Sequence, residues 1–207
     1  MKITEIKSEK GRLFKITLSG GKTAMLDKDY CLEKGIRQDM EMDAETLKQY
    51  IKESDYRRAL SRAVWYIERG SLSAKRLTEK LHSASFSKET VKNVVARMTE
   101  LGLIDDIAFA ERLAEHYLSK CISVRDAEYK MVNKGIDRNV VKAALDMFDV
   151  DATLQIKAII QKNYRLKITT DGGVQKVFAA LLRKGFNYSD IKSVLAEYSE
   201  EIKYNGE

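Results

Sequence analysis

The sequence predicts a mainly α-helical fold of tandem three-helix repeats, three units in all, after a small N-terminal antiparallel β meander. Three observations support this prediction. Apolar residues recur at helical spacing from residue 55 onward, a set of positions repeats every fifty residues, and the 207 residues include no proline. Because proline is absent, helices must end through glycine, asparagine and capping side chains, which favours compact turns between helices.

The first thirty residues differ from the rest of the chain. Residues 3–7, 13–18 and 23–26 are short, broadly alternating segments, and they are separated by good turn sequences at 9–12 and 19–22. We predict a two- or three-stranded antiparallel meander here. Such a sheet is marginally stable alone. We therefore expect it to pack on the following helix, which Asp43 can cap and which covers residues 44–51.

The repeat is anchored on Phe86, Ile136 and Phe186, which are spaced fifty residues apart. Equivalent positions also match around the anchors: Leu77, Ala127 and Val177; Leu81, Met131 and Leu181; the capping residues Ser87, Asp137 and Asn187; and Val91, Val141 and Ile191, each followed by a lysine (Lys92, Lys142 and Lys192). We interpret each unit as a helix, a glycine stop, an apolar plug and a newly capped helix.

The residue before each anchor is Ser85, Gly135 or Gly185. A left-handed glycine ends a helix without steric cost, so we expect the serine turn to be strained or differently shaped. Helical stretches at 55–69, 106–120 and 152–166 complete three helices per unit. The predicted divisions are 1–54 for the meander and its helix, then 55–104, 105–150 and 151–207 for the three repeats.

Charge is concentrated in one segment. The net charge of the chain is +6. Residues 57–104 hold ten basic and four acidic residues, so the net charge of this segment alone equals that of the whole chain. Such a basic segment indicates an anionic partner such as nucleic acid. No apolar run approaches the roughly 20 residues of a membrane helix, and the N-terminus has no apolar signal core. We expect a cytoplasmic protein without membrane association, with Cys31 and Cys121 as buried or half-buried thiols.

No catalytic constellation is visible in the sequence. His82 and His116 are the only histidines, and neither belongs to a metal-binding or nucleophile-base motif. Asp105 and Asp106 precede an apolar helical stretch, so helix capping explains them better than a metal site or an acid-base pair. We expect a binding protein with no enzymatic activity, no metal and no cofactor.

The candidate binding surface is the basic segment. At about 100° per residue, Arg58, Arg62 and Arg69 share one helix face, opposite Leu60, Val64 and Ile67. Trp65 falls near the arginines, where an exposed indole could stack on a base or contact a protein. The alternative is a solvated helix face with Trp65 packed under the sheet. The candidates for binding nucleic acid or a protein partner are Arg57, Arg58, Arg62, Trp65, Arg69, Lys75, Arg76, Lys80, Lys88 and Lys92.

From about residue 57 to 200 the chain resembles the RecX family of recombination regulators. The first unit matches in Ser73-Ala74-Lys75-Arg76-Leu77-Thr78-Glu79-Lys80-Leu81, and the link to the second unit in Leu101-Gly102-Leu103-Ile104-Asp105-Asp106-Ile107-Ala108-Phe109-Ala110. Lys134-Gly135-Ile136-Asp137 and Arg183-Lys184-Gly185-Phe186 continue the match. Ser85 and Cys121-Ile122-Ser123 depart from the family pattern, where glycine is common. The N-terminal strands suit the family variant with a β-hairpin extension.

The resemblance implies a regulator of the RecA recombinase in DNA repair, recombination and the SOS response. It implies a monomer that binds the RecA-DNA filament and limits its growth or stability, most simply as an inhibitor, although the residues do not determine the direction. Its partners would be RecA and single-stranded DNA, with double-stranded DNA as an option, bound weakly and in a salt-dependent manner. Two alternatives stay open: a helical DNA-binding transcription regulator and a protein-protein scaffold.

Overall fold

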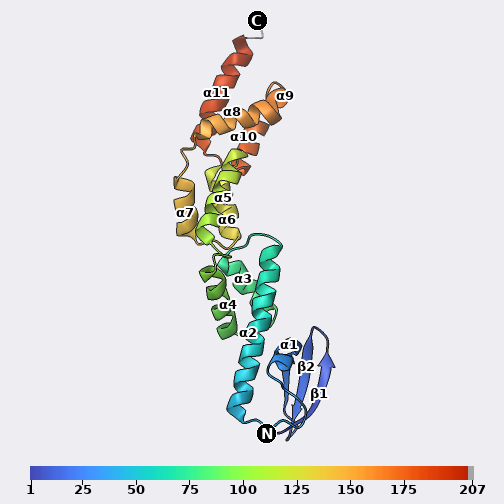
Figure 1. Ribbon diagram of the computed structural model, residues 1–207. Coiled ribbons are helices and arrows are strands. Elements are labelled where there is room, and N and C mark those ends of the chain that lie inside the picture. The colour runs from blue at the N-terminus through green and yellow to red at the C-terminus, as the bar shows by residue number, and fades with distance from the viewer. Residues whose placement is uncertain (205–207) are drawn as a thin grey trace. The chain divides into compact units, whose positions relative to one another are not determined.

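The computed structural model describes residues 1–204, with side chains described through Tyr198. The chain is mainly helical with one small antiparallel sheet, which confirms the predicted fold class (Figure 1). It divides into two compact units: the first ends at Ile104 and the second begins at Asp105.

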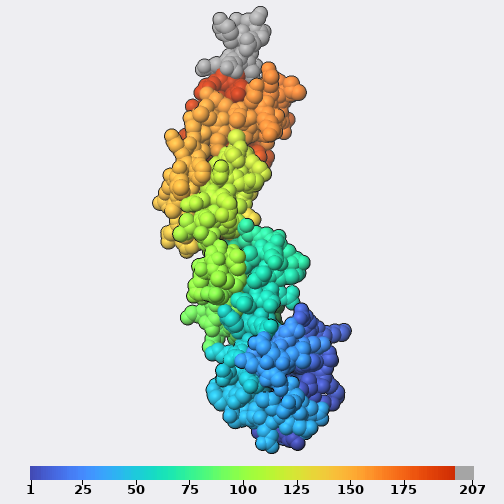
Figure 2. Space-filling view, viewed as in Figure 1, coloured from blue at the N-terminus to red at the C-terminus, as the bar shows by residue number. Residues whose placement is uncertain are grey.

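The N-terminal sheet has three antiparallel strands in the order β1-β2-β3, with bounds Ile3–Glu9, Leu13–Leu18 and Thr23–Asp27. Its buried face carries Ile3, Ile16, Leu18 and Leu26. These side chains form one core with the short helix α1 (Lys28–Glu33) and with apolar residues from the start of the next helix. The sheet therefore packs against α1 and the start of the following helix, as its small size requires. In Figure 2 the dark blue N-terminal residues lie directly against the lighter blue residues that follow them.

Helix α2 (Ala44–Glu68) is one continuous helix of 25 residues. The sequence prediction of two stretches, 44–51 and 55–69, was wrong because nothing interrupts residues 52–54. They are Lys52, Glu53 and Ser54, none of which stops a helix. Ser54 is fully buried, and its hydroxyl accepts a hydrogen bond from the Asp27 amide at 2.7 Å. The predicted division at residue 54 therefore falls inside a helix that joins the sheet to the first repeat.

The remaining helices follow in short steps. They are α3 (Ala74–Ser83), α4 (Lys88–Glu100), α5 (Asp106–Ser119), α6 (Val124–Asn133), α7 (Arg138–Asp146), α8 (Ala152–Ile159), the π-helical segment η1 (Ile160–Tyr164), α9 (Arg165–Ile168), α10 (Gly173–Arg183) and α11 (Tyr188–Tyr204). Their buried apolar residues form three separate clusters, within residues 59–104, 109–145 and 156–195, and the half-buried Cys121 packs against the third. The division into three repeats at the stated boundaries stays a prediction that these clusters support.

The turns at the fifty-residue anchors share one backbone conformation. Ser85 has a φ of 66°, and Gly135 and Gly185 each have a φ of 85°. The serine turn is therefore not differently shaped, and the expected strain consists of a side chain held in the left-handed region. Ser87 and Asp137 cap the helices that follow by accepting backbone hydrogen bonds, as predicted. Cys121, at the other departure from the family pattern, is also left-handed, with a φ of 55°.

Gly185 lies against another helix of the second unit. A Cβ built at this position would lie 2.7 Å from the hydroxyl oxygen of Ser123. That hydroxyl donates to the carbonyl of Lys184 at 2.6 Å and accepts from the amide of Asp126, so it caps α6 and holds the α10 turn at once. Glycine is needed here both for its φ and for this close approach.

Candidate nucleic-acid interface

A groove of about 300 Å³ lies on the first unit, between the N-terminal segment and α2. Its lining brings together residues far apart in sequence: Gly11, Arg12, Asp27, Asp29, Arg57, Arg58, Ser61, Arg62, Trp65 and Phe86. Four arginines face two aspartates, so the groove is net basic. Arg12, from the turn between β1 and β2, was missed at the sequence level, because only the fold brings that turn beside α2.

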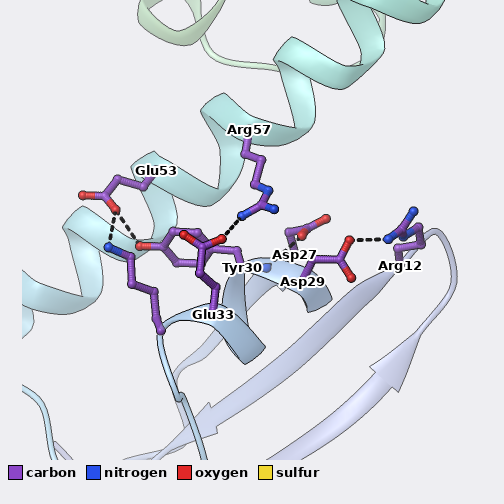
Figure 3. A network of polar contacts seen from close by, with 8 residues as sticks. Arg12, Asp27, Asp29, Tyr30, Glu33, Glu53 and Arg57 are labelled. Carbon is purple, nitrogen blue, oxygen red and sulfur yellow. Dashed lines mark hydrogen bonds and ion pairs between the residues drawn. The ribbon is translucent and has the colours of Figure 1, made fainter.

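Two of the groove's arginines form ion pairs with acidic residues of the N-terminal segment (Figure 3). A third forms an ion pair within α2. Arg57 pairs with Glu33 of α1, and this hydrogen bond raises the pKa of the guanidinium. Arg12 pairs with Asp29. Arg58 pairs with Asp55 one turn earlier at 3.0 Å, and its guanidinium lies 5.5 Å from the centre of the Phe86 ring. The pairs of Arg12 and Arg57 are solvent-exposed and weak, so an anionic ligand can compete for these cations.

Behind these pairs, Glu53 of α2 binds to α1. It accepts hydrogen bonds from Gln49 and from the hydroxyl of Tyr30, both at 2.8 Å, and these two bonds lower the pKa of its carboxyl group. The Lys34 ammonium lies 3.5 Å from the same carboxylate. Desolvation and the bond to Glu53 raise the pKa of the Tyr30 phenol. The network fixes α1, and with it Glu33, beside the arginines of α2.

The Trp65 cluster, formed by Arg62, Trp65 and Arg69, lies at the end of the groove. The Arg69 guanidinium lies 3.5 Å from the centre of the indole, and that of Arg62 lies 5.5 Å from it. Arg69 also donates to the Trp65 carbonyl at 3.2 Å. Trp65 is 40% exposed and belongs to neither apolar cluster of the first unit, so it does not pack under the sheet. Among described residues, no carboxylate forms an ion pair with Arg62 or Arg69.

The other candidates are distributed over α3 and α4. Arg76 pairs with Glu79 at 2.7 Å, and the Lys80 ammonium lies 5.0 Å from the centre of the Tyr66 ring. Lys75, Lys88 and Lys92 are exposed and do not line the groove. The structure therefore brings Arg57, Arg58, Arg62 and Trp65 together in the groove and adds Arg69 through Trp65. The remaining five candidates form no single site with them.

The residues that could suggest other chemistry have structural surroundings. Asp105 caps α5 by accepting hydrogen bonds from the amides of Ile107 and Ala108, which confirms the capping interpretation. His82 and His116 are exposed. Cys31 is a buried free thiol whose pKa burial raises to about 11, and Cys121 is a half-buried free thiol, as predicted. Among the described residues, no three side chains of the His, Cys, Asp and Glu types gather as a metal site would require.

Each described helix is too short or too polar to cross a lipid bilayer. Fold and site together define a helical protein with a small N-terminal sheet and a basic, aromatic groove. No protein-family model matches the chain. The chain is similar to curated proteins called regulatory protein RecX: it is 24% identical to one from Clostridium perfringens, with 94% of each chain covered. It is 28% identical to one from Prosthecochloris aestuarii, with 71% of this chain and 97% of the relative covered.

Solved structures agree on the fold. A crystal structure of regulatory protein RecX superposes with a TM-score of 0.65 at 20% identity, covering 93% of this chain and 98% of the other. RecX from Lactobacillus salivarius superposes with a TM-score of 0.61 at 20% identity, covering 69% and 96%. Similarity along nearly the whole chain and the shared fold support a RecX-family assignment, and the curated relatives are called regulatory proteins.

Proposed function

We propose that this protein regulates the RecA recombinase by binding the RecA-DNA filament and limiting its growth or stability, in the cytoplasm, during DNA repair and recombination. The choice of RecA as the partner rests on the family resemblance. The observation that carries the DNA contact is the Trp65 cluster, in which two arginines without carboxylate partners among described residues flank a half-exposed indole. Guanidinium groups bind phosphates, and an exposed indole stacks on bases of any sequence.

The arrangement favours binding along a strand over reading a sequence. Arg57 and Arg58 lie in the same groove as Arg62, so cations follow α2 over more than one turn. Such a row suits successive phosphates of a backbone, and it predicts strong salt dependence with little sequence preference. A transcription regulator would instead prefer one duplex site by about 10³-fold or more. A pure scaffold would lose nothing when the arginines are removed.

The test is RecA-catalysed strand exchange with wild-type protein and two variants. The site variant is Arg62→Ala/Trp65→Ala/Arg69→Ala. The control is Lys142→Ala/Lys176→Ala/Lys192→Ala, which removes three exposed cations from the second unit. We expect the wild type and the control to inhibit exchange at stoichiometric or lower amounts, and the site variant to require at least tenfold more protein. A wild-type protein without effect on exchange would refute the proposal, and a fully active site variant would refute the role of the Trp65 cluster.

A further inference from the structure

The third predicted repeat has a longer first helix than the other two. In each repeat this helix holds two residues, four positions apart, that are 0% exposed: Ala59 and Ala63, Ala110 and Ala114, and Ile156 and Ile160. Helices α2 and α5 both end five residues after the second of these, whereas the helix formed by α8, η1 and α9 ends eight residues after it. The third repeat therefore adds about one helical turn, which is α9.

The helix caps support this alignment. Asp105 and Asp151 cap α5 and α8 in the same way, each accepting hydrogen bonds from the amides two and three residues later, and each stands five residues before the first residue of its buried pair. From the second buried residue to the next equivalent one, Ala127 or Val177, the second repeat takes thirteen residues and the third takes seventeen. The two helices therefore begin in register, and the added residues lie at the end of the third repeat's helix.

The fold fixes this added turn in place. Ile168, at its end, is 4% exposed and belongs to the apolar cluster of the third repeat. The Thr170 hydroxyl donates to the Lys167 carbonyl at 2.7 Å. A Cβ built at Gly173 would lie 1.9 Å from the same carbonyl oxygen, so the start of α10 packs directly against the end of α9. The π-helical segment η1, a form frequent at functional sites, leads into the turn.

The exposed side of this helix end is strongly basic. Residues 105–207 hold sixteen basic and sixteen acidic residues, but residues 152–170 hold four basic residues and no acidic one. Lys157 pairs with Glu197 at 2.7 Å. The other three basic side chains are exposed, and no carboxylate in the described part of the chain forms an ion pair with them. We call them the α9 basic patch: Lys162, Arg165 and Lys167.

The helix dipole accounts for only part of this patch. Cations are favoured within the last turn of a helix, where the backbone carbonyls carry a partial negative charge. Arg165 and Lys167 lie in that turn, but Lys162 lies six residues before the end at Ile168. Packing does not require the cations either, because all three side chains are exposed. An anionic partner explains the whole patch.

The composition of the patch favours nucleic acid over an acidic protein. Two of its three cations are lysines, which bind phosphates but are depleted in protein-protein interfaces. Lys162 and Lys167 are five residues apart, which is about 7.5 Å along the helix and covers about two phosphates of one strand at about 3.4 Å each. An exposed leucine suits a protein partner, so the experiment includes Leu166, which is 85% exposed.

The patch offers no exposed ring on which a base could stack. Tyr164, the only aromatic residue of α8, η1 and α9, is half-buried against the apolar cluster of the third repeat. We propose that the α9 basic patch binds the phosphate backbone of nucleic acid, and that it binds single strands and duplex alike. The proposal rests on the proposed function only in that nucleic acid is a ligand. The Trp65 cluster of the first unit differs, because an indole stacks on unpaired bases.

The test measures DNA binding in the absence of RecA. The patch variant is Lys162→Ala/Arg165→Ala/Lys167→Ala. The matched control removes the same residue types from exposed positions of the same unit: Arg112→Ala/Lys142→Ala/Lys192→Ala. Leu166→Ser removes the exposed leucine alone, and circular dichroism checks that each variant is folded. Fluorescence anisotropy then measures binding to a labelled single strand and to a duplex of the same length over a range of salt concentrations.

We expect the patch variant to bind both DNAs at least fivefold more weakly, by similar factors, while the control and Leu166→Ser stay within twofold of the wild type. The slope of log affinity against log salt should fall by about 2 for the single strand and about 2.7 for the duplex, because each of three phosphate contacts contributes about 0.7 or 0.9. Trp65→Ala should instead weaken single-strand binding more than duplex binding.

Wild-type affinity in the patch variant, or an equal loss in the control or in Leu166→Ser, would overturn this inference. RecA-catalysed strand exchange tests the alternative partner: a patch variant that binds both DNAs normally but no longer inhibits exchange would assign this surface to a protein and overturn the inference. A wild type that binds DNA through the patch but leaves exchange unchanged would refute the proposed function and support this inference.

Discussion

Replacing Gly185 by alanine should separate steric crowding from backbone strain in the second unit. The left-handed φ of 85° costs alanine about 1–2 kcal/mol. The new Cβ would also lie 2.7 Å from the Ser123 hydroxyl oxygen, so that side chain must move. Moving it breaks the cap on Asp126, worth about 1 kcal/mol, and the bond to the Lys184 carbonyl, worth about 1 kcal/mol. Alanine also lowers the conformational entropy of the unfolded chain, which offsets about 0.5–1 kcal/mol of this loss in stability. We expect a net loss of about 2–3 kcal/mol.

Gly172→Ala is the matched control for this prediction. Gly172 also has a positive φ, of 63°, and no atom lies within 4 Å of a Cβ built there. It should therefore lose only about 0.5–1 kcal/mol. Urea unfolding, followed by circular dichroism, measures the loss of stability in each glycine variant. Hydrogen exchange of the first amides of α6 shows whether the Ser123 cap is lost. The double variant Ser123→Ala/Gly185→Ala should cost less than the two single losses added together, because the crowded hydroxyl is gone. Equal losses for both glycines, or strict additivity in the double variant, would refute the reasoning.

Three further predictions concern affinity, the Ser85 turn and pH. Arg62→Ala/Arg69→Ala should lower the slope of log affinity for single-stranded DNA against log salt by about 1.4, since each phosphate contact contributes about 0.7; a salt titration in which the slope is unchanged would place the phosphates elsewhere. Ser85→Gly should stabilise the first unit by about 0.5–1 kcal/mol, because φ is already 66°, and a lower urea midpoint would contradict this. Burial raises the pKa of the Cys31 thiol from its ordinary value of 9.0 to about 11, so the unfolded chain loses this proton first and stability falls as pH rises from 9 to 11, by up to about 1.4 kcal/mol per pH unit. Cys31→Ala should remove that part of the pH dependence, and an identical pH profile in both proteins would show that the thiol ionises freely.

Much of the fold follows from local patterns in the sequence. Alternation and turn residues predicted the N-terminal strands, and the fifty-residue anchors predicted left-handed turns at Gly135 and Gly185 and a capping residue after each anchor. These features depend on neighbours within a few residues. The continuity of α2 was missed because capping at Asp43 and helical spacing after residue 55 were interpreted as separate helices, although no breaker lies between them.

The site was less predictable because it depends on contacts between distant segments. Helical spacing placed Trp65 near Arg62 and Arg69, and the structure has this contact. No local pattern could reveal that Arg57 pairs with Glu33, or that Arg12 enters the same groove, because both contacts require the sheet to fold onto α2.

The most direct test of the account is the single-stranded-DNA-dependent ATPase activity of RecA, measured with and without this protein at two salt concentrations. We expect stoichiometric or lower amounts of the protein to reduce the ATPase rate at low salt. The reduction should weaken at higher salt, because phosphate contacts by the arginines of α2 supply part of the binding. An ATPase rate that is unchanged at both salt concentrations would contradict the central claim.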